Sequence, residues 1–173
     1  MRSLATSAAI LVLMVLTTTF AATRPGCADT VVNVCGKFSF WVPDDWKATK
    51  DSENPERTTY DSPDGNISLI VGPLTEKDAD LSDEEVTDFA DEELDEMKVT
   101  ADKTDTLEKF NIRLLEGTGE DESDPVVFKM LALNPGNDDT VLVVLIYGDA
   151  KHMSRTENQA TIDKIMRSLR PQG

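Results

Sequence analysis

Residues 140–147, with the sequence TVLVVLIY, form the most apolar stretch of the chain outside its N-terminal segment. Neighbouring side chains of a strand point to opposite faces of the sheet, so a strand that is apolar at successive positions must be covered on both faces. The stretch therefore predicts a central strand, with helices packed on both sides of its sheet.

Six further segments have the character of strands. β-branched and aromatic residues are frequent in them, and Gly, Pro, Asn and Asp separate them. They are residues 30–35, 38–42, 57–60, 66–72, 106–115 and 126–133. The turn sequence SPDGN at 62–66 predicts a hairpin between two of these strands. Residues 47–56 are polar and are expected to form a loop.

Two segments have helical periodicity. The first begins with a capping box, Ser82 and Glu85, and the second with Ser154 and Glu157. Apolar residues then recur at helical spacing, which predicts one inward face for each helix. These residues are Val86, Phe89, Ala90, Leu94 and Met97 in the first helix, and Ile162, Ile165, Met166 and Leu169 in the second. Pro171 prevents the second helix from continuing.

These patterns predict an α+β fold. We expect a single antiparallel β-sheet flanked by the two amphipathic helices, which is an α/β/α sandwich. The short connections favour a meander of antiparallel strands. One domain is expected over residues 30–171, a length sufficient for one hydrophobic core.

The N-terminal segment is typical of a cleavable signal peptide. Arg2 provides the positive charge, and residues 8–16 (AAILVLMVL) form an uninterrupted apolar run. We expect a signal peptide over residues 1–22, with cleavage after Ala28 as the alternative. The run is shorter than the about 20 residues that a membrane-spanning helix needs. The sequence thus predicts a periplasmic or secreted protein with no stable membrane insertion after cleavage.

The cleavage position decides the fate of the two cysteines. If cleavage follows residue 22, Cys27 and Cys35 both remain and could form a disulfide in an oxidising compartment. If it follows Ala28, Cys35 is a single thiol. Lipid attachment at Cys27 is disfavoured, because charged Arg24 and rigid Pro25 stand just before it.

The chain carries 33 acidic and 17 basic residues, a formal net charge of −16. Such a charge repels phosphate backbones and anionic membrane surfaces. Nucleic acid and lipid headgroups are therefore poor partners, whereas a basic protein, a cationic peptide or a divalent cation fits better. The simplest interpretation of the charge is that it keeps an exported protein soluble.

Residues 76–96 contain a dense run of carboxylates that could form an interaction surface on the first helix. The candidate residues are Asp83, Glu84, Asp88, Asp91, Glu92 and Asp95. Clustered carboxylates could alternatively bind calcium, which prefers oxygen ligands. The segment lacks the central Gly and the ligand spacing of an EF-hand, so a solvated helix face is the simpler interpretation.

No catalytic residue is predicted. His152 is the single histidine, is expected in a surface loop, and has no Gly-x-Ser-x-Gly motif to supply its nucleophile. A hydrolase with a carboxylate pair would require a pocket holding at least two acids of raised pKa. Zinc sites need several His or Cys ligands, and phosphate sites need a Gly-rich loop. We therefore expect neither enzyme activity nor a cofactor.

The sequence FSFWVPDDW at residues 38–46, followed by Tyr60-x-Ser-Pro-Asp-Gly, resembles a pattern of the PsbP/DcrB-like superfamily of small α/β sandwich domains. The resemblance covers residues 30–170 and implies a non-enzymatic accessory, assembly or chaperone-like role, without identifying any functional residue. Trp41 and Trp46 are expected in the core, with a binding patch on these two residues or in the polar turn 116–124 as the alternatives to the acidic helix. We thus expect an exported accessory or binding protein, without cofactor, that acts through protein–protein contacts in the cell envelope.

Overall fold

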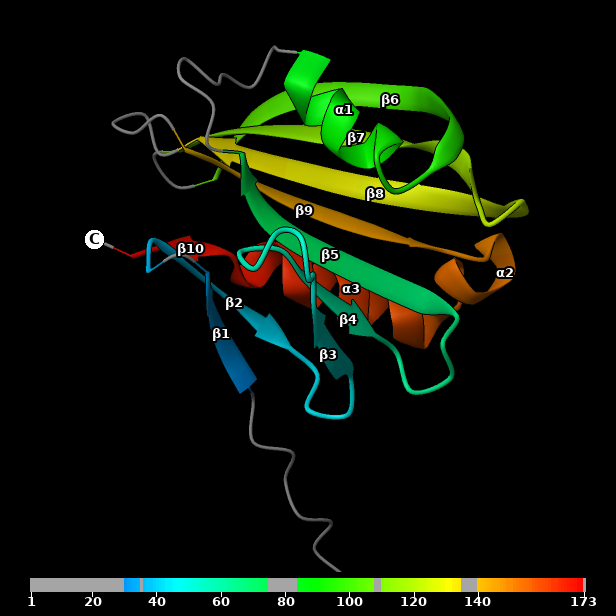
Figure 1. Cartoon of the computed structure of the whole chain (residues 1–173), viewed down its shortest axis with the longest axis horizontal. Helices are drawn as coiled ribbons and strands as arrows, with labels where there is room; N and C mark the ends of the chain where they lie inside the picture. The colour runs from blue at the N-terminus through cyan, green and yellow to red at the C-terminus, as the bar shows by residue number, and fades with distance from the viewer. Residues whose placement is uncertain (1–29, 35, 75–83, 108–109, 135–139, 173) are drawn as a thin grey trace, which may run out of the picture.

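The computed structural model describes residues 30–34, 36–74, 84–107, 110–134 and 140–172, whose strands form two antiparallel sheets (Figure 1). The elements in chain order are β1 (Thr30–Val34), β2 (Phe38–Val42), β3 (Lys47–Lys50), β4 (Thr58–Asp61), β5 (Ile67–Leu74), α1 (Glu84–Asp91), β6 (Asp95–Leu107), β7 (Phe110–Asp121), β8 (Asp124–Asn134), β9 (Val141–Gly148), α2 (Ala150–Met153), α3 (Thr156–Ser168) and β10 (Arg170–Pro171). The larger sheet has seven strands in the order β3-β4-β5-β9-β8-β7-β6, and the smaller has three in the order β1-β2-β10.

Strand β9 lies at the centre of the larger sheet, between β5 and β8. All of its residues are buried, and alternate side chains enter two separate hydrophobic cores. One core receives Leu142, Val144 and Ile146, and the other receives Val141, Val143, Leu145 and Tyr147. The prediction of a doubly covered central strand is therefore confirmed.

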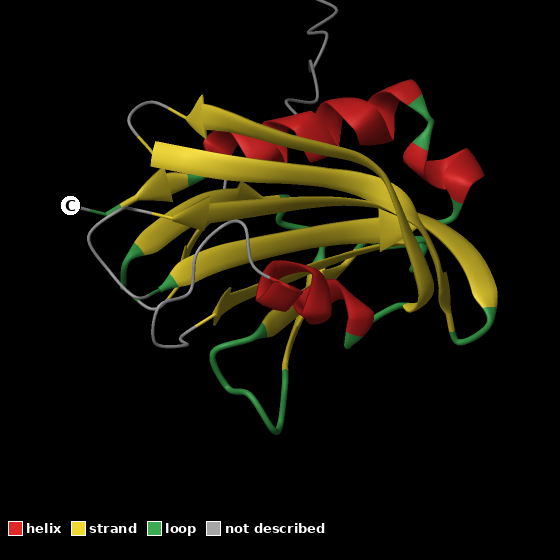
Figure 2. Ribbon diagram, turned by 90° about the horizontal axis from the view of Figure 1, so that it is seen from above, coloured by secondary structure: helices red, strands yellow, loops and turns green. Residues whose placement is uncertain are grey.

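Helices α1 and α3 lie on opposite faces of the larger sheet (Figure 2). Ile162 and Ile165 of α3 belong to one core, here called the α3-side core. Val86 and Phe89 of α1 belong to the other, the α1-side core. Burying a large apolar side chain contributes about 1.5 to 3 kcal/mol. Both helices are therefore held mainly by the side chains they bury.

The expectation of a single sheet is wrong, because β1, β2 and β10 form a second one. Phe38 and Phe40 of β2 fill the α3-side core, so the β1–β2 hairpin covers the same face of the large sheet as α3. The backbone N–H of Trp41 donates to Ser168 Oγ at 2.8 Å, which ties β2 to the end of α3. Strand β10 then pairs with the second edge of β2.

The first helix is shorter than its apolar spacing predicts. Helix α1 ends at Asp91, and Met97 lies in β6 instead. Strand β6 pairs with β7 over almost its whole length, and these main-chain hydrogen bonds replace the helical ones. Ser82 of the expected capping box lies outside the described residues.

The start of β6 is irregular. Glu96 adopts a left-handed φ of 46°, and the register with β7 shifts between Asp95 and Lys98. Gly117 of β7 passes so close to the Lys98 carbonyl and the Phe128 ring that an added Cβ would collide with both. Only glycine lets the irregular strand approach β7 this closely.

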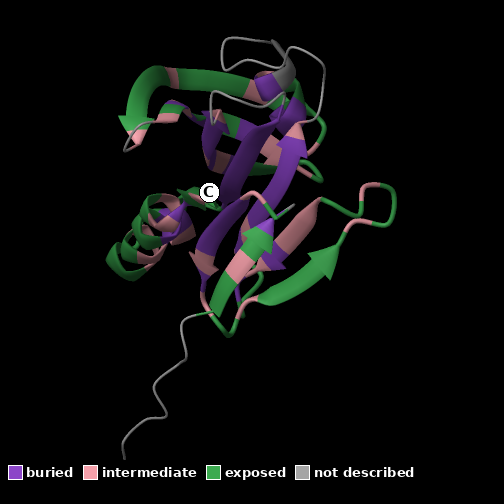
Figure 3. Cartoon of the chain, turned by 90° about the vertical axis from the view of Figure 1, so that its left-hand side faces the viewer, coloured by how far each residue is buried: buried purple, intermediate pink, exposed green. Residues whose placement is uncertain are grey.

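Two smaller expectations are also wrong. Residues 47–50, expected in a loop, form the exposed edge strand β3 (Figure 3). The second capping box is absent, because Arg155 is the N-cap of α3 and makes no side-chain capping bond. Ser154 Oγ donates instead to the Lys151 carbonyl at 3.1 Å.

Candidate functional site

The carboxylates chosen from the sequence do not share one helix face. Asp88 and Asp91 are exposed on α1, and Glu92 is exposed just after the helix ends. Asp95 is the first residue of β6 and Glu84 the first of α1, whereas Asp83 lies outside the described residues. We call Asp88, Asp91 and Glu92 the α1 acidic surface.

Arg57, directly before β4, fixes the position of this surface. Its two terminal nitrogens bind Glu93 Oε1 at 2.6 Å and Glu92 Oε2 at 2.7 Å. The guanidinium carbon lies 4.3 Å from the centroid of the Phe89 ring, a cation–π contact. We call Arg57, Phe89, Glu92 and Glu93 the Arg57 clamp. It joins the loop between β3 and β4 to the end of α1.

The Arg57 clamp is partly removed from water. Only 13% of the Arg57 side chain is exposed, and its Nε is buried without a hydrogen-bond partner within the described part of the chain. Burial raises the pKa of Glu93, an effect that the Arg57 charge opposes. Burial also raises the pKa of Tyr147 to about 12, with the Asp121 carboxylate adding to the effect. Burial is thus the main cause of both pKa shifts, and a neighbouring carboxylate adds to it at Tyr147.

The α1 acidic surface lies where a positive charge is favoured. The C-terminal end of a helix carries partial negative charge, and α1 has no basic residue in its last turn. Asp91 adds to this charge, whereas the charge of Glu92 is already offset by Arg57. Asp88 and Asp91 make no ion pair with any described residue. A Lys or Arg of a partner would meet both the helix end and these carboxylates.

The calcium alternative gains no support from the described residues. No group of three or more His, Cys, Asp or Glu side chains there is arranged to hold a metal ion. Residues 76–83, Cys27, Cys35 and the expected signal peptide lie outside those residues, so the predictions made for them stay predictions. In the same described part, no helix is long and apolar enough to cross a membrane.

A second acidic group lines a cavity of about 360 Å³ that contains Asp121, Asp124 and Asp149. Burial raises the pKa of Asp121, and the nearby Glu122 and Asp124 charges raise it further. The pKa of Asp149 is lowered, chiefly by its hydrogen bond with His152, whose Nδ1 lies 3.0 Å away. This cavity thus holds one acid of raised pKa, whereas a carboxylate-pair hydrolase would require two.

Three residues lie differently from their expected places. His152 belongs to the short helix α2, not to a loop. Trp41 and Trp46 are half-buried at the margin of the α3-side core, and Lys164 Nζ lies 3.5 Å from the centroid of the Trp41 ring.

Arg57 was not predicted, because no spacing rule connects it with carboxylates 35 and 36 residues away.

No protein-family model and no curated protein matches this sequence. Solved structures match it in fold. Cyanobacterial PsbP (CyanoP) from Synechocystis sp. PCC 6803 has a TM-score of 0.65 at 10% identity, over 84% of this chain and 94% of that protein. The Ran-binding protein Mog1p of Saccharomyces cerevisiae has a TM-score of 0.53 at 14% identity, over 83% and 95%. LpqN of Mycobacterium tuberculosis, described as involved in cell envelope biogenesis, has a TM-score of 0.51 at 16% identity, over 86% and 88%.

Identities this low establish a shared fold and nothing about ligands or partners. The shared fold confirms the architecture that the resemblance at residues 38–46 implied.

Proposed function

The chain has the PsbP/DcrB-like fold, and from this premise we propose that it is an exported, non-enzymatic accessory protein of the cell envelope that binds another protein. Two proteins of the same fold support a binding role and an envelope location, since Mog1p is described as Ran-binding and LpqN as involved in envelope biogenesis. Export rests on the signal-peptide pattern of residues 1–22.

The α1 acidic surface carries the proposal. Asp88 and Asp91 are exposed and unpaired among the described residues, while the Arg57 clamp holds the helix end beside them in place. A partner with clustered Lys or Arg would be attracted by the net charge and oriented by this surface. The partner proposed is therefore a basic protein.

Affinity capture from the envelope fraction of the native host, followed by mass spectrometry, tests this function. The test variant reverses two charges, Asp88→Lys with Asp91→Lys. The matched control reverses two exposed carboxylates elsewhere, Asp45→Lys with Glu157→Lys. The proposal predicts a partner that the wild type and the control recover and the test variant does not. Equal recovery by all three proteins, or no partner in repeated captures, would contradict it.

A further inference from the structure

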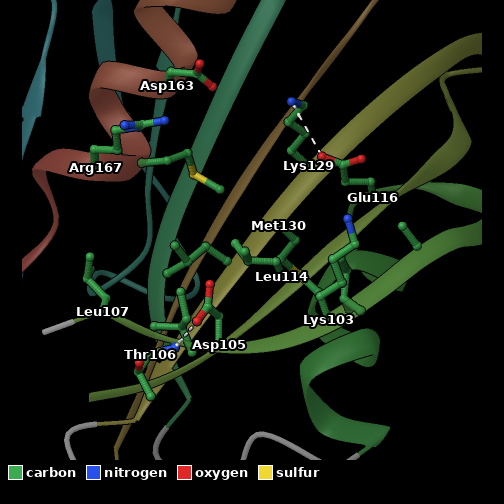
Figure 4. Close-up of a pocket in the computed structure, with 15 residues that line it drawn as sticks. Lys103, Asp105, Thr106, Leu107, Leu114, Glu116, Lys129, Met130, Asp163 and Arg167 are labelled. Carbon is green, nitrogen blue, oxygen red and sulfur yellow. Dashed lines mark hydrogen bonds and ion pairs between the residues drawn. The ribbon is translucent and has the colours of Figure 1, made fainter. Parts of the chain in front are cut away.

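A cleft separates α3 from the strands β6, β7 and β8 (Figure 4). Its volume is about 370 Å³, and small-molecule sites typically have about 300 to 1,000 Å³. It adjoins the α3-side core and lies on the face of the sheet opposite the α1 acidic surface. The proposed function makes no use of it.

The strand wall is apolar at its centre and charged at its outer edge. In the sheet register, Lys103 of β6 lies opposite Leu114 of β7, which lies opposite Leu131 of β8. In the next row, Asp105 lies opposite Ile112. Residues two apart on a strand share a face, so the apolar side chains of β7 and β8 form a continuous floor. Lys103 and Asp105 border this floor on the edge strand.

The helix wall repeats this pattern. Asp163, Met166 and Arg167 are three and four residues apart on α3, so they lie on one face. Half-buried Met166 packs against the α3-side core, and the side chains of Asp163 and Arg167 project toward the strand wall (Figure 4). Besides the Lys129–Glu116 pair on the strands, each wall therefore offers one cation and one anion beside an apolar surface.

These four charges are available to a ligand. At one end of the cleft, Lys129 Nζ and Glu116 Oε1 are 3.5 Å apart and neutralise each other. The Asp105 carboxylate accepts only a backbone N–H, at 2.7 Å. None of the four makes an ion pair with another described residue. The four are Lys103, Asp105, Asp163 and Arg167.

Two other cavities have a different charge. The cavity at Asp121 contains three aspartates and no basic residue, and the cavity beside Trp46 contains Asp45 and Asp64 and no basic residue. The cleft instead combines both charges with an apolar floor, as does a further cavity that contains Lys98 and Glu96 beside Val126 and Val127. A molecule with no net charge avoids the repulsion that a chain of net charge −16 exerts on anions.

We propose that this cleft binds a small zwitterion with an aliphatic body. The body lies on Leu114, Leu131 and Met166. Its anionic group faces Lys103 or Arg167, and its cationic group faces Asp105 or Asp163. Two kinds of molecule have this chemistry: a single-chain phosphocholine amphiphile and a short aliphatic peptide with free termini.

Titration calorimetry of the purified chain tests the proposal with both kinds of molecule. The probes are alkylphosphocholines of eight, ten and twelve carbons, kept below micelle formation, and the tripeptide Leu-Leu-Leu. If the alkyl chain is buried in the cleft, each added methylene tightens binding about fourfold. If the peptide is the better ligand, its acetylated and amidated form, which lacks both charges, binds about tenfold more weakly. Binding by neither probe, or equal binding of the charged and capped peptides with no chain-length effect, would overturn the proposal.

A variant and a matched control locate the site. Arg167→Ala removes a cleft cation from the exposed surface of α3, and Arg155→Ala removes an exposed cation at the other end of that helix. For whichever probe binds, the alanine variant of the cation that faces its anionic group, Arg167→Ala or Lys103→Ala, weakens binding about twofold to fivefold, and Arg155→Ala leaves it unchanged. Binding that neither Arg167→Ala nor Lys103→Ala weakens more than Arg155→Ala does would place the ligand outside the cleft.

Discussion

The two faces of the central strand β9 are covered in different ways. On one face, helix α3 and the β1–β2 hairpin form a large apolar core. On the other, the eight-residue helix α1 covers a smaller core, and the Arg57 clamp closes its edge. Apolar burial dominates the first face, with a hydrogen bond and a cation–π contact of Trp41 at its margin, whereas the second depends on burial together with a partly buried ion-pair cluster. Sensitivity to charge should therefore be concentrated on the α1 side.

The largest expected effects test whether both faces are truly packed cores. Phe89 on the α1 side and Ile165 on the α3 side are 2% and 0% exposed. Replacement by alanine should cost about 3 to 5 kcal/mol for Phe89 and about 2 to 5 kcal/mol for Ile165, measured by urea unfolding. Val31→Ala, at a side chain that is 61% exposed, is the control and should change stability by less than about 0.5 kcal/mol. A cost below about 1 kcal/mol for Phe89→Ala would mean that α1 is only loosely attached.

Variants of the Arg57 clamp test whether charge stabilises the α1 side of the sheet. Arg57→Met keeps the apolar stem but removes the partner of the largely buried Glu93, so it should cost about 2 to 3 kcal/mol at neutral pH. Glu92→Gln removes the partner that is 62% exposed and should cost less than about 1 kcal/mol. Similar losses for the two variants would show that burial does not distinguish these ion pairs.

Trp46→Ala tests the margin of the α3-side core. Trp46 packs against this core but is only half-buried, so truncation should cost about 1 to 2 kcal/mol, less than at a fully buried site. Thermal unfolding would measure the loss. A cost below about 0.5 kcal/mol would place Trp46 on the surface and make it a candidate for partner contact.

The smallest effect concerns charge on the α1 side. Burial and the neighbouring carboxylates raise the pKa of Asp121 in the folded protein. Ionising this carboxyl group is therefore less favourable in the folded than in the unfolded chain. The free energy of unfolding falls as the pH rises above 3.8 and through the pKa of the folded state. Asp121→Asn avoids this loss, so it should be more stable than wild type at pH 7, by at most about 1 kcal/mol because the site is partly solvated. The gain should vanish near pH 3.

Asp64→Asn is the opposite control. Hydrogen bonds from Asn66 and Ser62 lower the pKa of Asp64 to about 2, so its contribution is present above pH 3.8 and lost as the pH falls toward 2. This variant should be less stable than wild type at pH 7, and the difference should disappear in acid. Parallel pH profiles of melting temperature for both variants would reject the assigned signs.

Local patterns predicted the parts of the fold that local physics controls. The run of apolar residues gave β9, the SPDGN turn gave the β4–β5 hairpin, and helical spacing placed Ile162 and Ile165 in the core. Long-range pairing decided the rest. The spacing of Leu94 and Met97 is helical, yet pairing with β7 makes residues 95–107 a strand. Strand β2 is the central strand of the smaller sheet because β10 pairs with its second edge, and β10 follows β2 by more than a hundred residues.

The candidate sites were less predictable than the fold. Asp88 and Asp91 are exposed on α1, as the polar helix pattern predicts, and Glu92 is exposed just after it, but their role as an interaction surface stays a prediction. The Arg57 clamp joins residues 35 and 36 positions apart. The cleft depends on the register of three strands and on one face of α3. Neither arrangement has a signal in sequence spacing.

Hydrogen exchange of the chain, alone and in complex with its captured partner, tests whether the partner binds the α1 acidic surface. A partner bound there should slow exchange in residues 86–97, at the end of α1 and the start of β6, and leave α3 unchanged. Protection confined to α3 and the β1–β2 hairpin, with none at residues 86–97, would contradict the assignment of partner binding to the α1 acidic surface.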